Sequence, residues 1–291
     1  MKFEWLESFR VFAEEMNFTR AAEIRHISQP AFFRQIQNLS DHLGLQLYVK
    51  TGRNIQLTGS GEEVAIFARE MSERVNLFKR RLDLSIPAPQ ISVAAGHGCY
   101  LYLLGRGIKT FTAKASSKLK LLITNRDETL QHLRTGSAHI GITVLSNLPE
   151  DLQGTVIRRI RPVLVIPNHH RLAQHKSISV EQFKELSFVI PPEPSDLRAT
   201  IFRLCQEHNF VPNISVEASG WELMIHFVAV GLGAAVVNSC CKLQKGVVGI
   251  PIKQMSSTDY YLLHRKDQHL FDELKLLKKT LIQQVSKEEI F

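Results

Sequence analysis

The sequence predicts an α+β multidomain chain in which a small helical unit, a long helix and a larger α/β region follow one another. Three observations support this prediction. At 291 residues the chain is too long for one ordinary core. Before residue 86 apolar residues recur mainly at helical spacing, interrupted by one short hairpin pattern. From Ile91 onward, apolar strand-like runs alternate with helical segments, which is typical of parallel α/β sheets.

The composition excludes several classes of protein. Hydrophobic residues at 44% and charged residues at 22% are typical of a globular protein. No apolar run reaches the roughly 18 residues of a membrane span, and Glu4 and Glu7 interrupt any secretory pattern. We therefore expect a cytoplasmic chain without a membrane partner. The four cysteines form no CxxC pair and no zinc-like spacing with histidine, so we expect reduced thiols, no metal and no cofactor.

The net charge of +8 is only weak evidence for binding to nucleic acid, because the excess basic residues lie mainly outside the helical N-terminal segment. Residues 1–90 hold 12 Lys+Arg against 11 Asp+Glu, so most of the positive excess belongs to residues 91–291. A DNA-binding function must therefore be argued from a motif.

The first helix is predicted at Phe3–Glu15 from its apolar spacing. Thr19 is the expected N-cap of a second, short helix at 20–25. His26 and Ile27 make the turn that follows it.

A third helix begins after Ser28, an expected N-cap, and carries Pro30 in its first turn, where a missing N–H costs nothing. It runs to about Leu43 and ends at Gly44. Two helices joined by a short turn form a helix-turn-helix, whose second helix enters the major groove of DNA. The segment 45–57 then predicts a hairpin, or wing, with Arg53 at its tip.

The stretch 18–61, FTRAAEIRHISQPAFFRQIQNLSDHLGLQLYVKTGRNIQLTGSG, resembles the signature of LysR-type transcriptional regulators. The residues that carry this resemblance are Phe18, Ala21, Ala22, Ser28, Gln29, Pro30, Ala31, Arg34, Gln35, Ile36, Leu39, Leu43, Gly44, Leu47, Thr51, Gly52, Arg53, Leu57, Thr58 and Gly61. The resemblance implies a winged helix-turn-helix that binds double-stranded DNA. The DNA-binding residues that we predict are Ser28, Gln29, Pro30, Phe33, Arg34 and Arg53.

One residue departs from the family pattern. The family usually has a small hydroxyl residue immediately before Arg34, whereas this chain has Phe33 next to Phe32. Two interpretations stay open: Phe33 contacts a thymine methyl group, or it adds packing against the wing.

A long helix is predicted after Thr58, with an apolar series at steps of 4, 3, 4, 3 and 4. That series is Val64, Ala68, Met71, Val75, Phe78 and Leu82. The heptad pattern is typical of a two-stranded coiled coil, although a helix packed on its own chain would also show it. In the resembled family this helix is the dimer interface, which implies a homodimer or homotetramer. Residues 86–89, Ile-Pro-Ala-Pro, are expected to form a stiff hinge.

The expected domains are thus 1–58 for DNA binding, 59–89 for the linker helix and hinge, and 90–291 for a sensing domain. The family's sensing domain is two-lobed and similar to a periplasmic binding protein, and it binds a small-molecule effector between its lobes. We expect lobe I at about 90–160 and 247–291 and lobe II at about 161–246.

The effector is expected at strand C-termini and helix N-termini. The predicted effector-binding residues are Gly96, His97, Tyr100, Asn125, Thr143, Ser195 and Trp221. Tyr100 and Trp221 suit either stacking on an aromatic effector or packing of a lid. Relatives commonly have hydroxyl residues in the first loop, where this chain has Gly96 and Gly98, so the effector is expected to be less acidic, bulkier or absent.

Two other classes of protein are alternatives to a regulator. An enzyme lacks support, because the sequence has no nucleophile elbow, P-loop, zinc-protease motif or dinucleotide fingerprint. His169, His170 and His175 lack partners at metal-ligand spacing. A cysteine-based redox sensor of the same fold is the remaining alternative, with Cys99 at a helix start as its best candidate.

The resemblance also implies contact with RNA polymerase.

Overall fold

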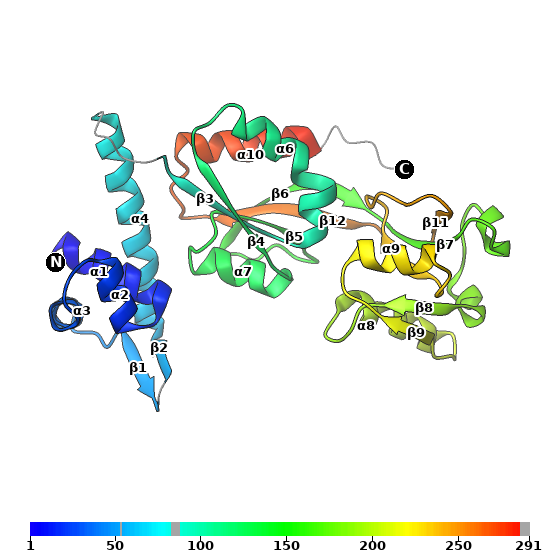
Figure 1. The fold of residues 1–291 in the computed structure, drawn as a ribbon, viewed down its shortest axis with the longest axis horizontal. Coiled ribbons are helices and arrows are strands. Elements are labelled where there is room, and N and C mark those ends of the chain that lie inside the picture. Colours follow the sequence, from blue (N-terminus) through cyan, green and yellow to red (C-terminus); the bar gives the residue numbers. More distant parts are fainter. Residues whose placement is uncertain (53, 83–87, 286–291) are drawn as a thin grey trace.

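Three parts follow one another along the chain, as Figure 1 shows: a helical N-terminal domain, the long helix α4, and an α/β region with two lobes. The structure is a computed structural model that describes residues 1–52, 54–82 and 88–285. Within those residues, no helix is both long and apolar enough to cross a membrane.

The N-terminal domain packs three helices and a hairpin around one apolar core. Its elements are α1 (Phe3–Glu15), α2 (Phe18–Ile24), α3 (Gln29–Leu43), β1 (Tyr48–Thr51) and β2 (Asn54–Leu57). Phe9, Phe12 and Phe32 are fully buried in this core. The two strands pair antiparallel, with Tyr48 opposite Leu57, so the winged helix-turn-helix architecture is confirmed.

Local capping residues set the helix ends. Ser28 accepts a hydrogen bond from the Ala31 N–H, and Gly44 ends α3 with φ of +66°, both as predicted. The prediction that Thr19 caps α2 is wrong. Asn17 is the N-cap, because its side-chain oxygen accepts from the N–H groups of both Thr19 and Arg20.

Helix α4 (Gly59–Arg81) begins after Thr58, whose hydroxyl accepts from the Gly61 N–H. Its first half packs on α1 and buries Ala65 and Ala68. Ala68 therefore does not belong to a free apolar face, contrary to the predicted heptad series. A different set of apolar residues remains exposed or half-buried along the helix: Val64, Phe67, Met71, Val75, Phe78 and Leu82.

Lobe I has a five-stranded sheet of order β4-β3-β5-β12-β6. Its strands are β3 (Gln90–Ala95), β4 (Lys118–Ile123), β5 (Ile140–Val144), β6 (Leu152–Ile160) and β12 (Thr258–Arg265). Strands β4, β3 and β5 run parallel, while β12 is antiparallel to both β5 and β6.

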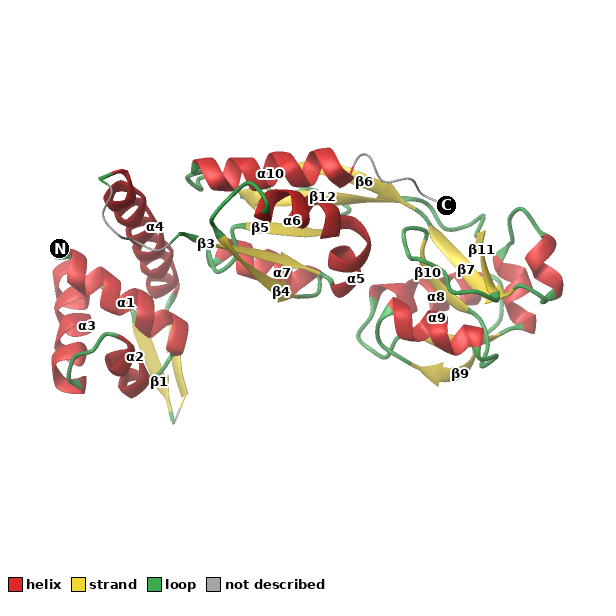
Figure 2. Ribbon diagram, turned by 45° about the horizontal axis from the view of Figure 1, so that its top comes forward, coloured by secondary structure: helices red, strands yellow, loops and turns green. Residues whose placement is uncertain are grey.

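Helices cover both faces of this sheet. They are α5 (His97–Cys99), which continues through a π-helical turn (Tyr100–Leu104) into α6 (Gly105–Thr112), with α7 (Arg126–Arg134) and α10 (Asp272–Val285). Figure 2 shows α6 and α10 on one face and α7 on the other. Helix α10 begins at Asp272, with Asp272 and Glu273 in its first turn, where acidic side chains suit the positive end of the helix dipole.

Lobe II has a three-stranded sheet, a parallel strand pair and two main helices. The sheet, of order β10-β7-β11, contains β7 (Pro162–Pro167), β10 (Ala235–Asn238) and β11 (Val247–Pro251). The pair is β8 (Ser187–Ile190) with β9 (Asn213–Glu217), and the helices are α8 (Asp196–Glu207) and α9 (Trp221–Ala229). Two 3-10 turns, Arg171–Gln174 and Val180–Glu185, complete the lobe.

The lobe boundary expected at residue 247 is wrong. Strand β11 pairs with β7, with Gly249 opposite Val165, so it belongs to lobe II. The chain returns to lobe I between Pro251 and Thr258, where β12 joins the first sheet. An apolar run at 247–252 indicates a strand but not which sheet receives it. Of the expected hinge at 86–89, residues 86 and 87 lie outside the described residues.

Candidate DNA-binding surface and interlobe cavity

Helix α3 presents one apolar and one exposed face. Phe32, Ile36 and Leu39 are completely buried, and they hold the helix on the domain core. The residues predicted to bind DNA lie on the opposite face and are exposed: Ser28, Gln29, Pro30, Phe33 and Arg34. Arg53, the sixth predicted residue, lies outside the described residues.

Acidic neighbours neutralise the other arginines around α1 and α2. Arg10 pairs with Glu14 at 3.1 Å, and Arg20 pairs with Glu15 at 2.7 Å. Arg34 has no ion-pair partner among the described residues of the domain. The near-zero net charge of the domain therefore includes one exposed cation on α3, Arg34, whose charge is not offset by an adjacent carboxylate.

Phe33 combines the two features that the sequence left open. Phe33 is 46% exposed on the face of α3 that lies opposite the domain core. Its ring also lies 5.5 Å from the ring of Phe18, and Phe18 in turn contacts Tyr48 of the wing. Phe33 thus packs on α2, and not directly on the wing as expected.

A cavity of about 330 Å³ lies between the lobes. Six of the seven predicted effector residues line it: Gly96, His97, Asn125 and Thr143 from lobe I, and Ser195 and Trp221 from lobe II. They come together because they lie at or just after the C-terminal ends of β3, β4 and β5 or at the starts of α8 and α9, so strand C-termini and helix N-termini face one another.

Tyr100, the seventh predicted residue, does not line this cavity. Its hydroxyl lies 2.7 Å from the Val93 carbonyl oxygen of β3 and 2.9 Å from the Leu122 carbonyl oxygen of β4, and its single proton is shared between these two acceptors. Burial raises the pKa of Tyr100 well above its ordinary value. The π-helical turn directs the ring back toward the sheet, a feature that helical periodicity does not reveal.

Three contacts that the sequence did not suggest join the lobes at the cavity. Nη1 of Arg126 lies 2.9 Å from Oδ2 of Asp196. Nδ1 of His97 lies 3.6 Å from Oε2 of Glu222. Gly98 lies against Trp221 so closely that a Cβ at position 98 would overlap the indole ring. Arg126 and Asp196 stand directly after the caps Asn125 and Ser195, and this place at a helix start is the signal that could have indicated them.

The cavity wall is mainly apolar with a few polar groups, which is the usual chemistry of a small-molecule site. Its apolar lining includes Ile142, Val144, Met224 and Tyr260. Some polar groups are already engaged: Asn125 accepts from the Glu128 N–H at 2.9 Å, and so caps α7.

Three of the four cysteines, Cys99, Cys205 and Cys241, are buried. Burial raises the pKa of Cys99 to about 12 and that of Cys205 to about 11, so the nucleophilic thiolate is disfavoured. Cys241 is also buried and has a raised pKa for the same reason. No group of three or more His, Cys, Asp or Glu in the described part of the chain is arranged to hold a metal ion.

An exposed reading helix beside a wing, joined by one long helix to a two-lobed domain with a cavity, defines a DNA-binding regulator with a ligand-sensing part. Family models agree with this architecture. Residues 3–62 match the bacterial regulatory helix-turn-helix protein, lysR family, and residues 86–286 match the LysR substrate binding domain. The chain therefore belongs to the LysR family of transcriptional regulators.

Characterised relatives are similar over most of their length. The chain is 27% identical over 238 residues to the RuBisCO operon transcriptional regulator of Allochromatium vinosum, covering 80% of this chain and 78% of that one. It is 25% identical over 285 residues to the regulator AlsR of Bacillus subtilis, covering 92% of each. These relatives are named as transcriptional regulators, which is consistent with a protein that is not an enzyme.

Solved structures share the fold. A full-length OxyR variant from Pseudomonas aeruginosa superposes with a TM-score of 0.75 at 22% identity, over 99% of this chain and 98% of that one. Full-length CbnR, solved with its target DNA, superposes with a TM-score of 0.54 at 19% identity, over 99% of this chain and all of that one. At these identities the likeness concerns the fold.

Proposed function

We propose that the chain reads a specific operator through α3 and the wing, and that a small molecule bound between the lobes modulates promoter activity. The observation that carries the proposal is the interlobe cavity, because residues from both lobes meet there at strand C-termini and helix N-termini. A ligand at that place can favour one lobe arrangement over another, which is the requirement for regulation. Such a regulator acts in the cytoplasm and needs no cofactor.

The DNA contacts follow from the exposed face of α3. Gln29 can bind adenine through two hydrogen bonds, whereas Arg34 can bind a guanine edge or a phosphate. Ser28 and Pro30 fix the first turn of α3, and the exposed N-terminus of this helix can approach the phosphate backbone of DNA. Arg53 at the wing tip is proposed to bind phosphate or the minor groove.

Selection from a randomised double-stranded DNA library tests this part. We expect the full chain to enrich one motif with two related halves, because two-fold protein symmetry is mirrored in the operator. Enrichment of no motif, with salt-sensitive binding to every duplex, would show a DNA-binding protein without sequence preference.

The ligand is proposed to be a compact, largely uncharged molecule with a few hydrogen-bonding groups. The charged groups Arg126 and Asp196 at the cavity pair with each other, while Thr143 and Ser195 offer hydroxyls on opposite lobes. His97 and Trp221 then provide a ring nitrogen and an aromatic face.

A thermal-shift screen of the full chain against metabolites tests the cavity. A true ligand raises the unfolding temperature in proportion to its occupancy of the folded state. Thr143→Val keeps the shape of the side chain but removes the hydroxyl, so it should weaken binding of the ligand. Thr112→Val, at an exposed position of α6 away from the cavity, should leave ligand binding unchanged. Equal binding by both variants would place the ligand elsewhere.

The exposed apolar residues of α4 are proposed to form a homodimer contact. Phe67, Phe78 and Leu82 are 44%, 60% and 56% exposed and recur at helical spacing with Met71 and Val75. A second copy of the same helix would cover them as a coiled coil. Phe78→Glu should yield monomers by analytical ultracentrifugation, whereas Glu63→Gln on the same helix should not. From the family we also propose that dimers pair into tetramers and that the DNA-bound protein contacts RNA polymerase.

A further inference from the structure

Two neighbouring strands of lobe I run from the interlobe cavity to helix α4. At one end, Thr143 and Val144 of β5 and Tyr260 of β12 line the cavity. The strands are antiparallel, with Tyr260 opposite Val144 and Leu263 opposite Gly141. If this register is continued by two residues, Arg265 at the far end of β12 lies opposite His139, which directly precedes β5. These two strand ends face α4.

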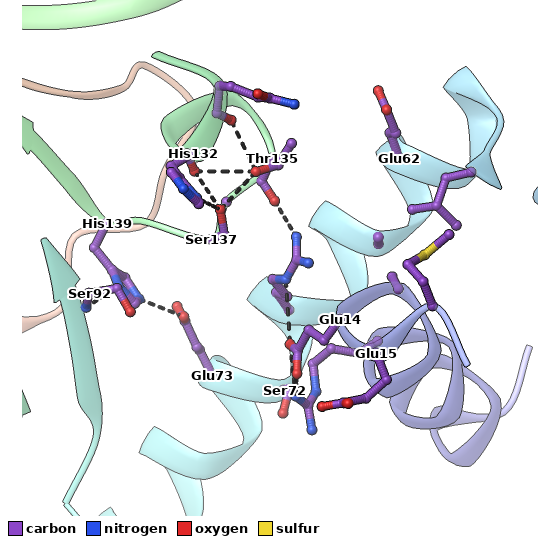
Figure 3. Close-up of a pocket in the computed structure, with 18 of the residues that line it drawn as sticks. Glu14, Glu15, Glu62, Ser72, Glu73, Ser92, His132, Thr135, Ser137 and His139 are labelled. Atoms are coloured by element: carbon purple, nitrogen blue, oxygen red, sulfur yellow. Dashed lines mark hydrogen bonds and ion pairs between the residues drawn. The ribbon is translucent and has the colours of Figure 1, made fainter. Parts of the chain in front are cut away.

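The β5 end is bound to α4 through a histidine of defined tautomer (Figure 3). The Ser92 N–H donates to Nδ1 of His139 over 2.9 Å. The proton of the neutral ring is therefore on Nε2, which donates to Oε1 of Glu73 over 2.7 Å. The His139 side chain is only 10% exposed, whereas the Glu73 side chain is 38% exposed, so the contact is shielded on the lobe I side and open to water on the α4 side.

The β12 end is bound one helical turn away. The Arg265 guanidinium pairs with Glu70, and its side chain is also only 10% exposed. Glu70 and Glu73 are three residues apart and so share one face of α4. Gly136 leaves room for the arginine, because a Cβ there would lie 2.8 Å from Nη1 of Arg265.

Helix α4 carries these contacts on to the DNA-binding domain. Arg69, adjacent to Glu70, donates to the Thr135 carbonyl oxygen of lobe I and lies 3.6 Å from Glu14 of α1. The Arg69 side chain is 16% exposed. One short stretch of α4 thus contacts both the sensing lobe and the first helix of the DNA-binding domain.

We propose that β5 and β12 couple the cavity to the DNA-binding domain within one chain, through the pairs His139–Glu73 and Arg265–Glu70. From Thr143 to His139 the strand rises only about 13 Å. Both strands lie inside the sheet, where Ile142, Leu262 and Leu263 are almost completely buried, so a shift at the cavity end is carried along them with little bending. The inference rests on the proposed function only in taking the cavity as the place where the signal arises.

A double-mutant cycle tests this coupling without knowledge of the effector. Gly98→Val places a side chain where the Trp221 ring lies, so any folded variant has a displaced ring or separated lobes. Glu70→Gln with Glu73→Gln removes both carboxylate charges from α4. Binding affinity is measured for the full chain and the duplex that the unmodified chain selects.

We expect Gly98→Val to change DNA affinity at least about fivefold in the native background and less than about twofold in the Glu70→Gln/Glu73→Gln background. An equal change in both backgrounds would overturn the proposal, as would no change in a Gly98→Val protein with native circular dichroism. Gly98→Ala, a smaller wedge, replaces it if the valine variant does not fold.

Glu62→Gln with Glu63→Gln provides the matched control, because it removes two charges from the same helix before the region that contacts lobe I. In that background the effect of Gly98→Val should persist in full. If Gly98→Val had the same effect in both backgrounds while a metabolite still bound in the thermal-shift screen, coupling through β5 and β12 would be rejected. The proposed effector site would not be affected by that result.

Discussion

The ring of Phe33 lies 5.5 Å from the ring of Phe18, and yet 46% of Phe33 remains exposed on the face of α3 that is predicted to meet DNA. One side chain is therefore anchored to α2 and available to a base edge at the same time. This arrangement reconciles the two roles that the sequence left open, because packing fixes the position of the ring from which an apolar contact would be made.

Replacing Phe33 should change the DNA sequence that the chain prefers. We expect Phe33→Ser to alter the base selected at one position of the motif, because a thymine methyl group loses its apolar contact. The lost ring contact should also cost about 1 kcal/mol of stability. Library selection and thermal unfolding measure the two effects. Phe33→Leu, which keeps an apolar side chain, should retain the native motif, and an unchanged motif for Phe33→Ser would leave Phe33 with packing alone.

The N-cap of α2 provides a paired stability test. Asn17→Ala removes the acceptor for two backbone N–H groups and should cost about 1 kcal/mol. Thr19→Ala, at the exposed position that sequence patterns favour, should change stability by less than about 0.5 kcal/mol. Urea unfolding of the two variants compares them directly, and equal losses would contradict the assignment of the cap.

Mild peroxide should leave the protein active in DNA binding. Burial raises the pKa of Cys99 to about 12, so little thiolate is present near neutral pH. Intact mass spectrometry before and after treatment should show no oxidised Cys99, Cys205 or Cys241, and affinity for the selected duplex should be unchanged. Loss of binding that Cys99→Ser prevents would instead establish the redox-responsive alternative.

Acid should destabilise lobe I through His264. Its Nδ1–H donates to the Arg265 carbonyl oxygen over 2.8 Å, and its Nε2 accepts from Nζ of Lys278, also over 2.8 Å. Burial, more than the neighbouring Lys278 charge, lowers the pKa of His264 below 6.5, so the fold favours the neutral ring. Below roughly pH 6.5 this histidine binds a proton in the unfolded chain but stays neutral in the folded chain. The free energy of unfolding therefore falls as the pH falls toward the lowered pKa of His264 in the folded state.

The unfolding temperature measured between roughly pH 7 and pH 5 checks this sign. His264→Gln should flatten the profile over that window, whereas His269→Gln, at an exposed position, should leave it as it is. A steeper loss of stability in His264→Gln would contradict the argument.

The sequence predicted best those features that depend on neighbours in the chain. Ser28, Gly44 and Thr58 set helix ends through contacts within a few residues, so local chemistry was sufficient to find them. The capping of α2 was missed because Asn17 and Thr19 are both good caps, and only geometry shows which side chain reaches the free N–H groups.

Features that depend on distant partners were predicted less well. The apolar pattern of β11 does not say that its partner is β7 in lobe II, and the direction of Tyr100 depends on a π-helical turn. The cavity residues were found because parallel strands end at a common edge. The pair Arg126–Asp196 was missed because it forms only when the two lobes meet.

The most direct test of sequence-specific DNA binding is the affinity of Arg34→Ala for the duplex selected by the unmodified chain. Arg34 is exposed on α3, and we expect its removal to weaken specific binding by about 1–3 kcal/mol and to relax the preference at one base pair. Arg203→Ala, which removes an exposed arginine of lobe II, should bind almost as the native protein does. If a folded Arg34→Ala protein bound the duplex with native affinity and preference, the assignment of α3 as the DNA-reading helix would be contradicted.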